Sequence, residues 1–326
     1  MFQIVFPIVD GLQARADQVE LSATFPRVTK KAVHTVDRIR ALLHFGQGTS
    51  PGNHLNGESS MEIFSSIRAV LAALVLFGFG VGQSHAFELQ WFGQSAFKLT
   101  TESGKVIVID PFLLKNPKTP EELKDLKKLG KVDLILVTHG HFDHTADVPA
   151  LAEMTGAKVG MNADMGSVYG SLGLVPKEQL LRWNKSGTVT PIGDNIKITM
   201  VRAEHSSSVS HEGAVHAGGE PVGYIIELEN GYRIYHSGDT GVFGDMKMIG
   251  EYYKPDLALV CIGGWFTMGP KEAAYAMGSL MQPKMVIPMH YGTFPPLKGT
   301  PQEMIDALGD STVKVKVMTP GETLTM

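Results

Sequence analysis

A cluster of histidine and aspartate side chains directly after a buried strand places the strongest constraint on this chain. The segment 132–138, VDLILVT, is a short aliphatic run of the kind that forms a buried strand. It continues directly into HGHFDH, which contains His139, His141, Asp143 and His144. Imidazole nitrogen and carboxylate oxygen are ligands of first-row transition metals. The motif therefore predicts a metal site on a loop that a rigid sheet holds beside a crevice.

Three further candidate ligands stand where other predicted strands end. His205 follows the strand 195–203, Asp239 follows the strand 231–236, and His290 comes at the end of the buried run in KMVIPMHYG. Histidine and aspartate are common in turns, so each of these residues has an ordinary structural explanation when it is taken alone. Because all three stand where buried strands end, the set as a whole favours metal ligation.

Other polar residues near these strand ends are interpreted as structural. His236 is expected to support the site or to belong to the core rather than to bind metal, and Asp110 to hydrogen-bond a ligand histidine. Glu204 is interpreted as a turn residue. Cys261, in the middle of a strand, is expected to be a small buried hydrophobic residue rather than a reactive thiol.

Two segments are predicted to wall a substrate pocket. The Gly-rich segment 208–221 is interpreted as a loop in which His211 and His216 are solvated. The segment HYGTFPPL supplies Tyr291 and Phe294 as candidates for substrate contact.

The predicted elements after residue 87 begin with closely spaced strands and continue with strands that alternate with helices. Such an order suggests one α/β (α+β) domain over 87–326, with two mixed sheets and helices outside. Strands are expected at 88–93, 95–101, 105–112, 132–138, 157–161, 188–192, 195–203, 222–229, 231–236, 256–264 and 284–292, and helices at 120–130, 145–155 and 270–281.

Residues 61–86 have the three parts of a secretory signal peptide. Arg68 provides the charged start, the apolar run covers 69–82, and Ser-His-Ala ends at Ala86. The run is shorter than the roughly 20 residues that a membrane span needs. We expect cleavage after Ala86 and an exported, periplasmic or secreted protein without a stable membrane span.

A signal peptide stands at the N-terminus of a protein, yet residues 1–60 precede the predicted one. It shows no sustained helical or strand periodicity, and 47–60 has the composition of a loop. Our hypothesis is that translation begins at Met61 and that 1–60 is an artefact of the assigned start. The rival interpretation is a short amphipathic cytoplasmic extension around 33–43 that precedes a membrane anchor.

Composition narrows the class of function. The 29 Lys and Arg against 33 Asp and Glu give a net charge of −4, so no basic field is available to hold nucleic acid. A single cysteine excludes a disulfide framework and any multi-cysteine metal site. The 43% of hydrophobic residues excludes a wholly disordered chain. The expected partner is a small-molecule substrate.

The motif H-x-H-x-D-H, a later His, the Asp of G-D-T and a final His resemble the metallo-β-lactamase superfamily over 87–326. WFGQSAFKL, VIVIDPF, GGEPVGY, GGWFTMGP and MHYGTFPPL are similar to one branch of metal-dependent hydrolases, related to ascorbate-phosphate lactonases and N-acyl phosphatidylethanolamine phospholipases. The resemblance implies a four-layer αββα sandwich with two metal ions at one edge.

The resemblance also divides the seven candidate ligands between two divalent ions. The first ion would be bound by His139, His141 and His205, and the second by Asp143, His144 and His290, with Asp239 bridging both. His141 in place of Glu argues against the di-iron flavoprotein members. Zinc suits these donors best, with manganese or iron as alternatives.

Two divalent ions that share a water lower its pKa toward neutrality, and Asp143 is placed to orient this nucleophile and handle its proton. The expected function is hydrolysis of a lactone, ester or amide. One alternative is a phosphodiesterase that acts on a small or lipid phosphodiester. The other is an exported metal-binding protein without turnover, which a complete ligand set disfavours. The same chemistry serves all these substrates, and loops set the specificity.

Overall fold

The computed structural model describes residues 87–326 except residue 194. The predicted signal peptide at 61–86 and the extension at 1–60 lie outside the described residues. Within the described part of the chain, none of the helices has the length and hydrophobicity that crossing a membrane requires.

One seven-stranded sheet is formed by the first strands of the domain and its C-terminal strand. β1, β2, β3 and β16 pair antiparallel, and β3 to β6 continue as a parallel series. In spatial order the strands are β16 (Thr323–Thr325), β1 (Glu88–Gly93), β2 (Ala96–Thr100), β3 (Val106–Ile109), β4 (Leu134–Leu136), β5 (Lys158–Asn162) and β6 (Leu180–Trp183).

The second seven-stranded sheet is formed by later strands, between Thr188 and Val315. β12 to β15 are parallel, and β11, β8 and β7 extend the sheet in antiparallel steps. In spatial order the strands are β15 (Lys314–Val315), β14 (Met285–Met289), β13 (Leu257–Cys261), β12 (Arg233–His236), β11 (Val222–Glu227), β8 (Lys197–Arg202) and β7 (Thr188–Val189). Two antiparallel steps separate β8 from β12, so β8, β12 and β14 all end at the same edge.

The two sheets pack face to face through a common apolar layer. Alternate residues of each strand point inward, and Phe97, Tyr224 and Leu259 are fully buried members of this layer. Each such buried side chain contributes about 1.5–3 kcal/mol through removal of its surface from water. The inward faces of both sheets therefore form the central core.

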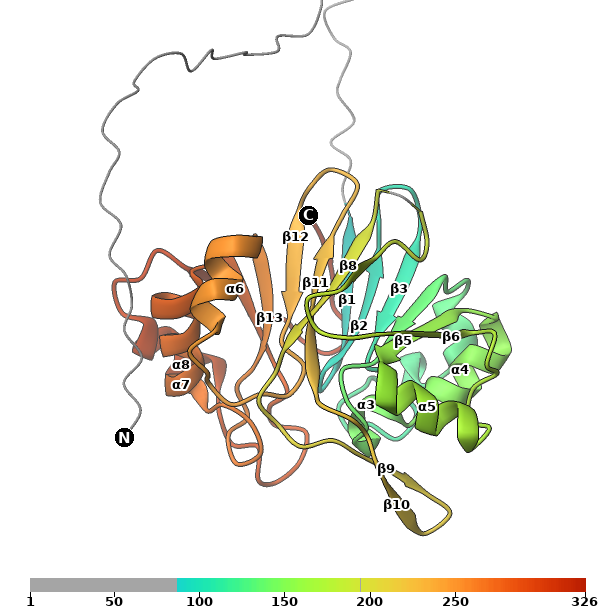
Figure 1. Cartoon of the computed structure of the whole chain (residues 1–326). Coiled ribbons are helices and arrows are strands. Elements are labelled where there is room, and N and C mark those ends of the chain that lie inside the picture. Colours follow the sequence, from blue (N-terminus) through green and yellow to red (C-terminus); the bar gives the residue numbers. More distant parts are fainter. Residues whose placement is uncertain (1–86, 194) are drawn as a thin grey trace, which may run out of the picture. The chain divides into compact units, whose positions relative to one another are not determined.

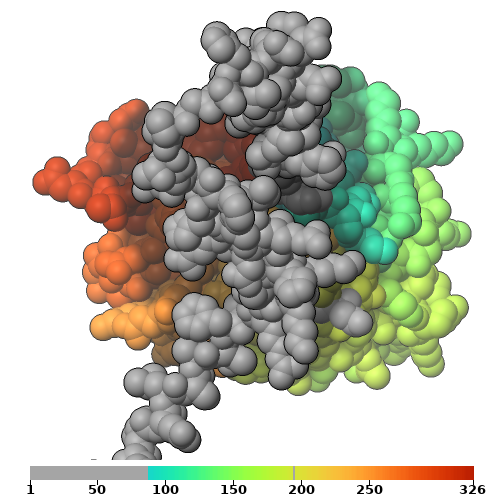
Figure 2. Space-filling model, turned by 90° about the horizontal axis from the view of Figure 1, so that it is seen from above, coloured from blue at the N-terminus to red at the C-terminus, as the bar shows by residue number. Residues whose placement is uncertain are grey.

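Helices cover the outer face of each sheet. α4 (Val148–Thr155) and α5 (Ala163–Ser171) pack over the first sheet, and α6 (Met246–Tyr253), α7 (Pro270–Tyr275) and α8 (Pro301–Leu308) pack over the second. Figure 1 shows these two sets of helices on opposite sides of the strands. Figure 2 shows the teal and green segments of the domain on one side and the orange and red segments on the other. The predicted four-layer αββα sandwich is confirmed.

The prediction of a helix at 120–130 is wrong. The segment instead forms two 3₁₀ turns, η2 (Glu121–Leu123) and η3 (Leu126–Leu129), on either side of Asp125. The Asp125 backbone is extended, and its side chain accepts a hydrogen bond from the Lys127 N–H, so it starts a new turn instead of continuing a helix.

The Gly-rich segment 208–221 is not simply a loop. Ser208–His211 (β9) and Ala214–Ala217 (β10) form an antiparallel hairpin that Glu212 and Gly213 close. Both turn residues have positive φ, at 48° and 80°, which suits a tight connection. His211 and His216 were expected to be solvated. Both side chains are half-buried, so this expectation is only partly right.

Several other elements differ from the sequence prediction. The helix expected at 145–155 begins only at Val148, as α4, and a separate short helix, α3 (Phe142–Thr145), precedes it. The helix expected at 270–281 continues from α7 as a π-helical turn, η4 (Ala276–Met281). The strand expected at 188–192 is limited to Thr188–Val189. The elements α5, β6, α6, α8, β15 and β16 were not predicted.

Candidate metal centre

The seven predicted ligands converge at one edge of the sandwich. The HGHFDH loop follows β4 in the first sheet, whereas His205, Asp239 and His290 follow β8, β12 and β14 in the second. Together they form two groups, one with His139, His141 and His205 and the other with Asp143, His144, Asp239 and His290, and within each group the ligand atoms lie within 4.8 Å of one another. Each group has a donor set that could hold a divalent ion.

The first group consists of three imidazoles that face one another. His139 Nε2 lies 2.9 Å from His141 Nδ1, and His205 Nε2 lies 3.3 Å from the same atom. Burial lowers the pKa of all three rings, and the positive charge of His144 adds to this effect at His139. These rings are therefore neutral near pH 7, which is the form that binds a metal.

The second group is built around the buried Asp239 carboxylate. Asp239 Oδ2 lies 3.0 Å from His290 Nε2, and Oδ1 lies 3.4 Å from His144 Nε2. Oδ2 also lies 3.8 Å from His205 Nε2, so Asp239 adjoins both groups. Asp143 Oδ2 approaches His290 Nε2 to 3.4 Å.

The charges of the second group perturb its pKa values strongly. Burial acts against the charged imidazolium of His290, but the Asp239 and Asp143 carboxylates together outweigh it and the pKa rises to about 9. Asp239, Asp110 and Asp143 raise the pKa of His144 against the same effect of burial. Burial also acts against charge on Asp143, yet His144 and His290 keep its pKa well below the ordinary value.

Besides His290 Nδ1, two buried polar atoms of this group lack a hydrogen-bond partner among the described residues. They are His144 Nε2 and Asp239 Oδ1, which lie 3.4 Å apart. Leaving a buried polar atom unpaired costs about 1–3 kcal/mol. A divalent ion that accepts both lone pairs would satisfy these atoms, so the residues fit the metal that the motif implies.

Asp110 holds one of the candidate ligands, as the sequence suggested. Its Oδ2 lies 2.8 Å from His144 Nδ1, which leaves His144 Nε2 directed at the centre. Asp110 also accepts hydrogen bonds from the Thr138 N–H at 2.8 Å and the Thr138 hydroxyl at 2.7 Å. A carboxylate behind a ligand histidine fixes the ring orientation and makes its free nitrogen more basic.

Gln94 belongs to the site and was missed from the sequence. Its amide nitrogen donates to Asp143 Oδ2 at 2.7 Å and lies 2.7 Å from His290 Nε2. Gln94, Asp110 and His290 are buried, and all three have left-handed φ values, of 51°, 46° and 57°. Such strained backbone positions gather at functional sites. The only signal in the sequence was the tight turn in WFGQS.

The other polar residues that the sequence analysis singled out contact the connections that carry the candidate ligands. His236 is buried, accepts from the Gly238 N–H at 3.1 Å and lies 3.1 Å from the Ser95 carbonyl, so it anchors the turn before Asp239 rather than ligating. The Glu204 N–H donates to Thr240 Oγ1 at 2.9 Å and so ties two ligand-bearing connections together. The thiol of Cys261 is fully buried 3.5 Å from the Thr240 carbonyl, and burial raises its pKa to about 11. The expected burial of Cys261 is confirmed, and His236 is buried as well.

A cavity of about 470 Å³ opens over both groups of candidate ligands. His141, Asp143, His205, Asp239 and His290 all line it. Phe294 lines this cavity as predicted. Tyr291 does not, because its ring packs against Trp91 with centroids 5.7 Å apart.

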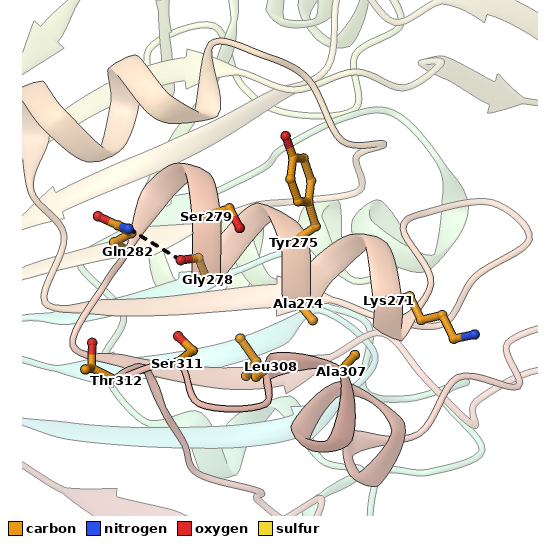
Figure 3. A pocket seen from close by; sticks show the side chains of 10 residues that line it. All are labelled: Lys271, Ala274, Tyr275, Gly278, Ser279, Gln282, Ala307, Leu308, Ser311 and Thr312. Atoms are coloured by element: carbon orange, nitrogen blue, oxygen red, sulfur yellow. Dashed lines mark hydrogen bonds between the residues drawn. The ribbon is translucent and has the colours of Figure 1, made fainter.

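A larger open cavity of about 710 Å³ lies elsewhere, between η4 and α7 on one side and α8 on the other (Figure 3). None of the seven candidate ligands is among the residues that line it, and its polar groups include Lys271, Tyr275 and Gln282. The cavity over the clustered ligands is therefore the candidate active site.

Comparison with known proteins agrees with this geometry. Residues 105–291, which contain all seven candidate ligands, match the family described as "Beta-lactamase superfamily domain". A "UPF0173 metal-dependent hydrolase" of Polaromonas sp. (strain JS666 / ATCC BAA-500) is 56% identical over 241 residues, which cover 72% of this chain and 88% of that protein. The chain belongs to the metallo-β-lactamase superfamily. It is a metal-dependent hydrolase of this superfamily, and hence an enzyme.

Two solved structures are also similar to this chain. Igni18, a metallo hydrolase from the archaeon Ignicoccus hospitalis, is 36% identical with a TM-score of 0.65, and the match covers 74% of this chain and 98% of Igni18. The metallo-beta-lactamase fold protein YhfI from Bacillus subtilis is 13% identical with a TM-score of 0.54, over 74% of this chain and 100% of that one, and shows the fold alone.

Proposed function

We propose that the protein hydrolyses a lactone, ester or amide with two divalent metal ions held by the seven clustered side chains. The observation that supports this proposal is the pair of adjoining ligand groups beneath a cavity of about 470 Å³. A mononuclear site would need only one of these groups, whereas Asp239 adjoins both.

The proposed ligands follow the two groups. His139, His141 and His205 would hold one ion, and Asp143, His144 and His290 the other, with Asp239 shared between them. Zinc is the proposed metal because imidazole nitrogen dominates the donor set, and manganese and iron are the alternatives. Bound divalent ions would supply a water with a pKa near neutrality and a Lewis acid for the oxygen of the scissile group.

Asp143 is the proposed catalytic residue because it lines the cavity as a carboxylate at neutral pH. Gln94 donates to its Oδ2 and so fixes the plane of the carboxyl group. In that orientation Asp143 can align the attacking water and accept its proton. Gln94 and Asp110 are the proposed positioning residues, since each holds a ligand by a direct hydrogen bond.

Reconstitution of the chelated protein with zinc, manganese or iron tests this proposal. The readouts are metal equivalents per chain and hydrolysis of a lactone, an aryl ester, an amide and a small phosphodiester. We expect two equivalents and turnover of a carbonyl substrate. Asp143→Ala should lose about 100-fold or more in activity, whereas His211→Ala, outside the centre, should keep it. Full turnover after exhaustive chelation would end the proposal.

We further propose that residues 61–86 are a cleaved signal peptide, that 1–60 precedes the true start, and that 87–326 is the exported enzyme. Arg68, the apolar run 69–82 and the small residues up to Ala86 support this proposal. N-terminal sequencing of the native protein should find Phe87. A native start at residue 1 or nearby would contradict it.

A further inference from the structure

The cavity over the centre has an apolar wall made by three phenylalanines from separate segments. Phe142 lies in α3, Phe266 in the connection that follows β13, and Phe294 in the connection that follows β14. Phe142 is 61% exposed and Phe266 is 57% exposed. Apolar side chains that gather on a concave surface and remain in contact with water mark a binding site for an apolar group.

Ring contacts hold part of this wall in place before any ligand binds. The Phe142 and Phe294 ring centroids lie 5.9 Å apart, and both rings lie on the buried ring of Phe112, at 5.8 Å and 6.3 Å. Aromatic pairs at these separations attract one another beyond simple burial. A preformed wall saves the entropy that ordering these side chains would otherwise cost on binding.

The rest of the lining is neutral or belongs to the centre. Ser206, Ser208 and Ser210 line the cavity and offer hydroxyl groups to a neutral polar atom. Among the described residues that line this cavity, none is Lys or Arg. An anionic group placed away from the reacting bond would lose its hydration there without gaining a cationic partner.

We infer that this cavity selects a neutral ester or lactone whose apolar acyl or aryl group packs against Phe142, Phe266 and Phe294. The inference rests on the proposed hydrolase function and adds the substrate class. It disfavours substrates that carry a free phosphate or carboxylate beyond the scissile group.

Binding of two matched ketones to the zinc-loaded protein tests the inference. The probes are a long-chain methyl ketone and the keto acid of the same chain length, which differ in one terminal charge and have no leaving group. Isothermal titration calorimetry gives both affinities without turnover. We expect the neutral ketone to bind at least about tenfold more tightly, with affinity rising as its chain lengthens.

Two cavity variants and one control distinguish the contribution of the apolar wall to binding from the effect of the ligand's charge. Phe266→Ala should weaken binding of the neutral ketone by roughly 10- to 100-fold. Tyr252→Ala removes a 74% exposed aromatic ring from α6, away from the lining, and should leave binding unchanged. Ser210→Lys should improve binding of the keto acid relative to that of the neutral ketone by roughly 2- to 5-fold.

Equal or tighter binding of the keto acid by the wild type would overturn the inference, as would equal effects of Phe266→Ala and Tyr252→Ala. Metal-dependent ester turnover together with keto-acid preference would overturn this inference alone. The expected ketone selectivity in a protein that hydrolyses no carbonyl substrate would instead contradict the proposed function.

Discussion

At the residue scale, Asp239 is the side chain on which a two-metal centre most depends. Its carboxylate lies within 3.0–3.8 Å of His290, His144 and His205, which belong to different ligand groups. Two dications near each other repel, and a shared carboxylate offsets that repulsion, whereas an amide supplies no charge. Asp239→Asn should therefore reduce metal content from two equivalents toward one, with activity falling further than occupancy.

Elemental analysis beside the hydrolysis rate checks this prediction. The matched control is Asp245→Asn, an exposed aspartate that pairs with Arg202 outside the centre and should keep two equivalents. If Asp239 merely capped the turn around it, Asn would replace it well. Two equivalents with an unchanged rate in Asp239→Asn would leave the shared carboxylate without support.

The opposite pKa shifts in the two ligand groups predict that metal binding to the second group releases protons. The raised pKa values of His144 and His290, the latter to about 9, leave both rings protonated at pH 7 without metal. Metal needs the neutral rings, so affinity should rise up to about pH 9 and fall as the pH drops, by about tenfold per displaced proton per pH unit.

The first group has lowered pKa values and binds without this competition, so acidification should empty the second group first. Titration calorimetry in two buffers with different ionisation enthalpies counts the released protons, and about two are expected when the second group fills. Binding without proton release would contradict the assigned charge states.

At the scale of elements, the close approach of the ligand loop to the β9–β10 hairpin requires a glycine. A Cβ on Gly140 would lie 2.7 Å from the Ser208 carbonyl oxygen and 2.9 Å from its carbon, both backbone atoms. Gly140→Ala should therefore cost about 1–3 kcal/mol of unfolding free energy. It should also displace His139 and His141 and lower activity by about 100-fold.

Urea unfolding and metal content measure both effects. Gly244→Ala is the control, because a Cβ there meets nothing within 4 Å and its φ is not left-handed. We expect this control to stay within about 0.5 kcal/mol of the wild type. If the two variants behaved alike, the packing argument at Gly140 would be wrong.

The elements also show what the sequence could predict. The runs in β4 and β14 are continuous and apolar, so their ends could be located, and candidate ligands follow those ends closely. Gln94 could not be found this way, because its partner Asp143 is 49 residues away and meets it only through the fold. The hairpin β9–β10 was hidden because glycine and serine suit both loops and turns.

At the scale of the whole molecule, the candidate centre joins the two sheets. The HGHFDH loop belongs to the first sheet, and His205, Asp239 and His290 belong to the second. Bound metal should therefore stabilise the domain as well as activate it. An ion present at 100 times its Kd adds about 2.7 kcal/mol to the unfolding free energy.

Chelation should then lower the Tm by about 5–10 °C, since 1 kcal/mol shifts a domain of this size by about 2–4 °C. Differential scanning calorimetry of the chelated, dialysed protein checks this expectation, and added zinc should restore the original value. An unchanged Tm in protein shown to be free of metal would contradict the joining role.

The burial of Cys261 makes the opening kinetics of the second sheet measurable in the unmodified protein. This thiol is the single one in the chain, lies in β13 with no exposed surface, and contacts the turn that carries Asp239. A thiol-specific reagent can reach it only after β13 separates from its neighbours, so the labelling rate reports how often that separation occurs. Zinc bound at Asp239 should slow the labelling in proportion to its occupancy, which gives a record of metal loading that needs no substrate.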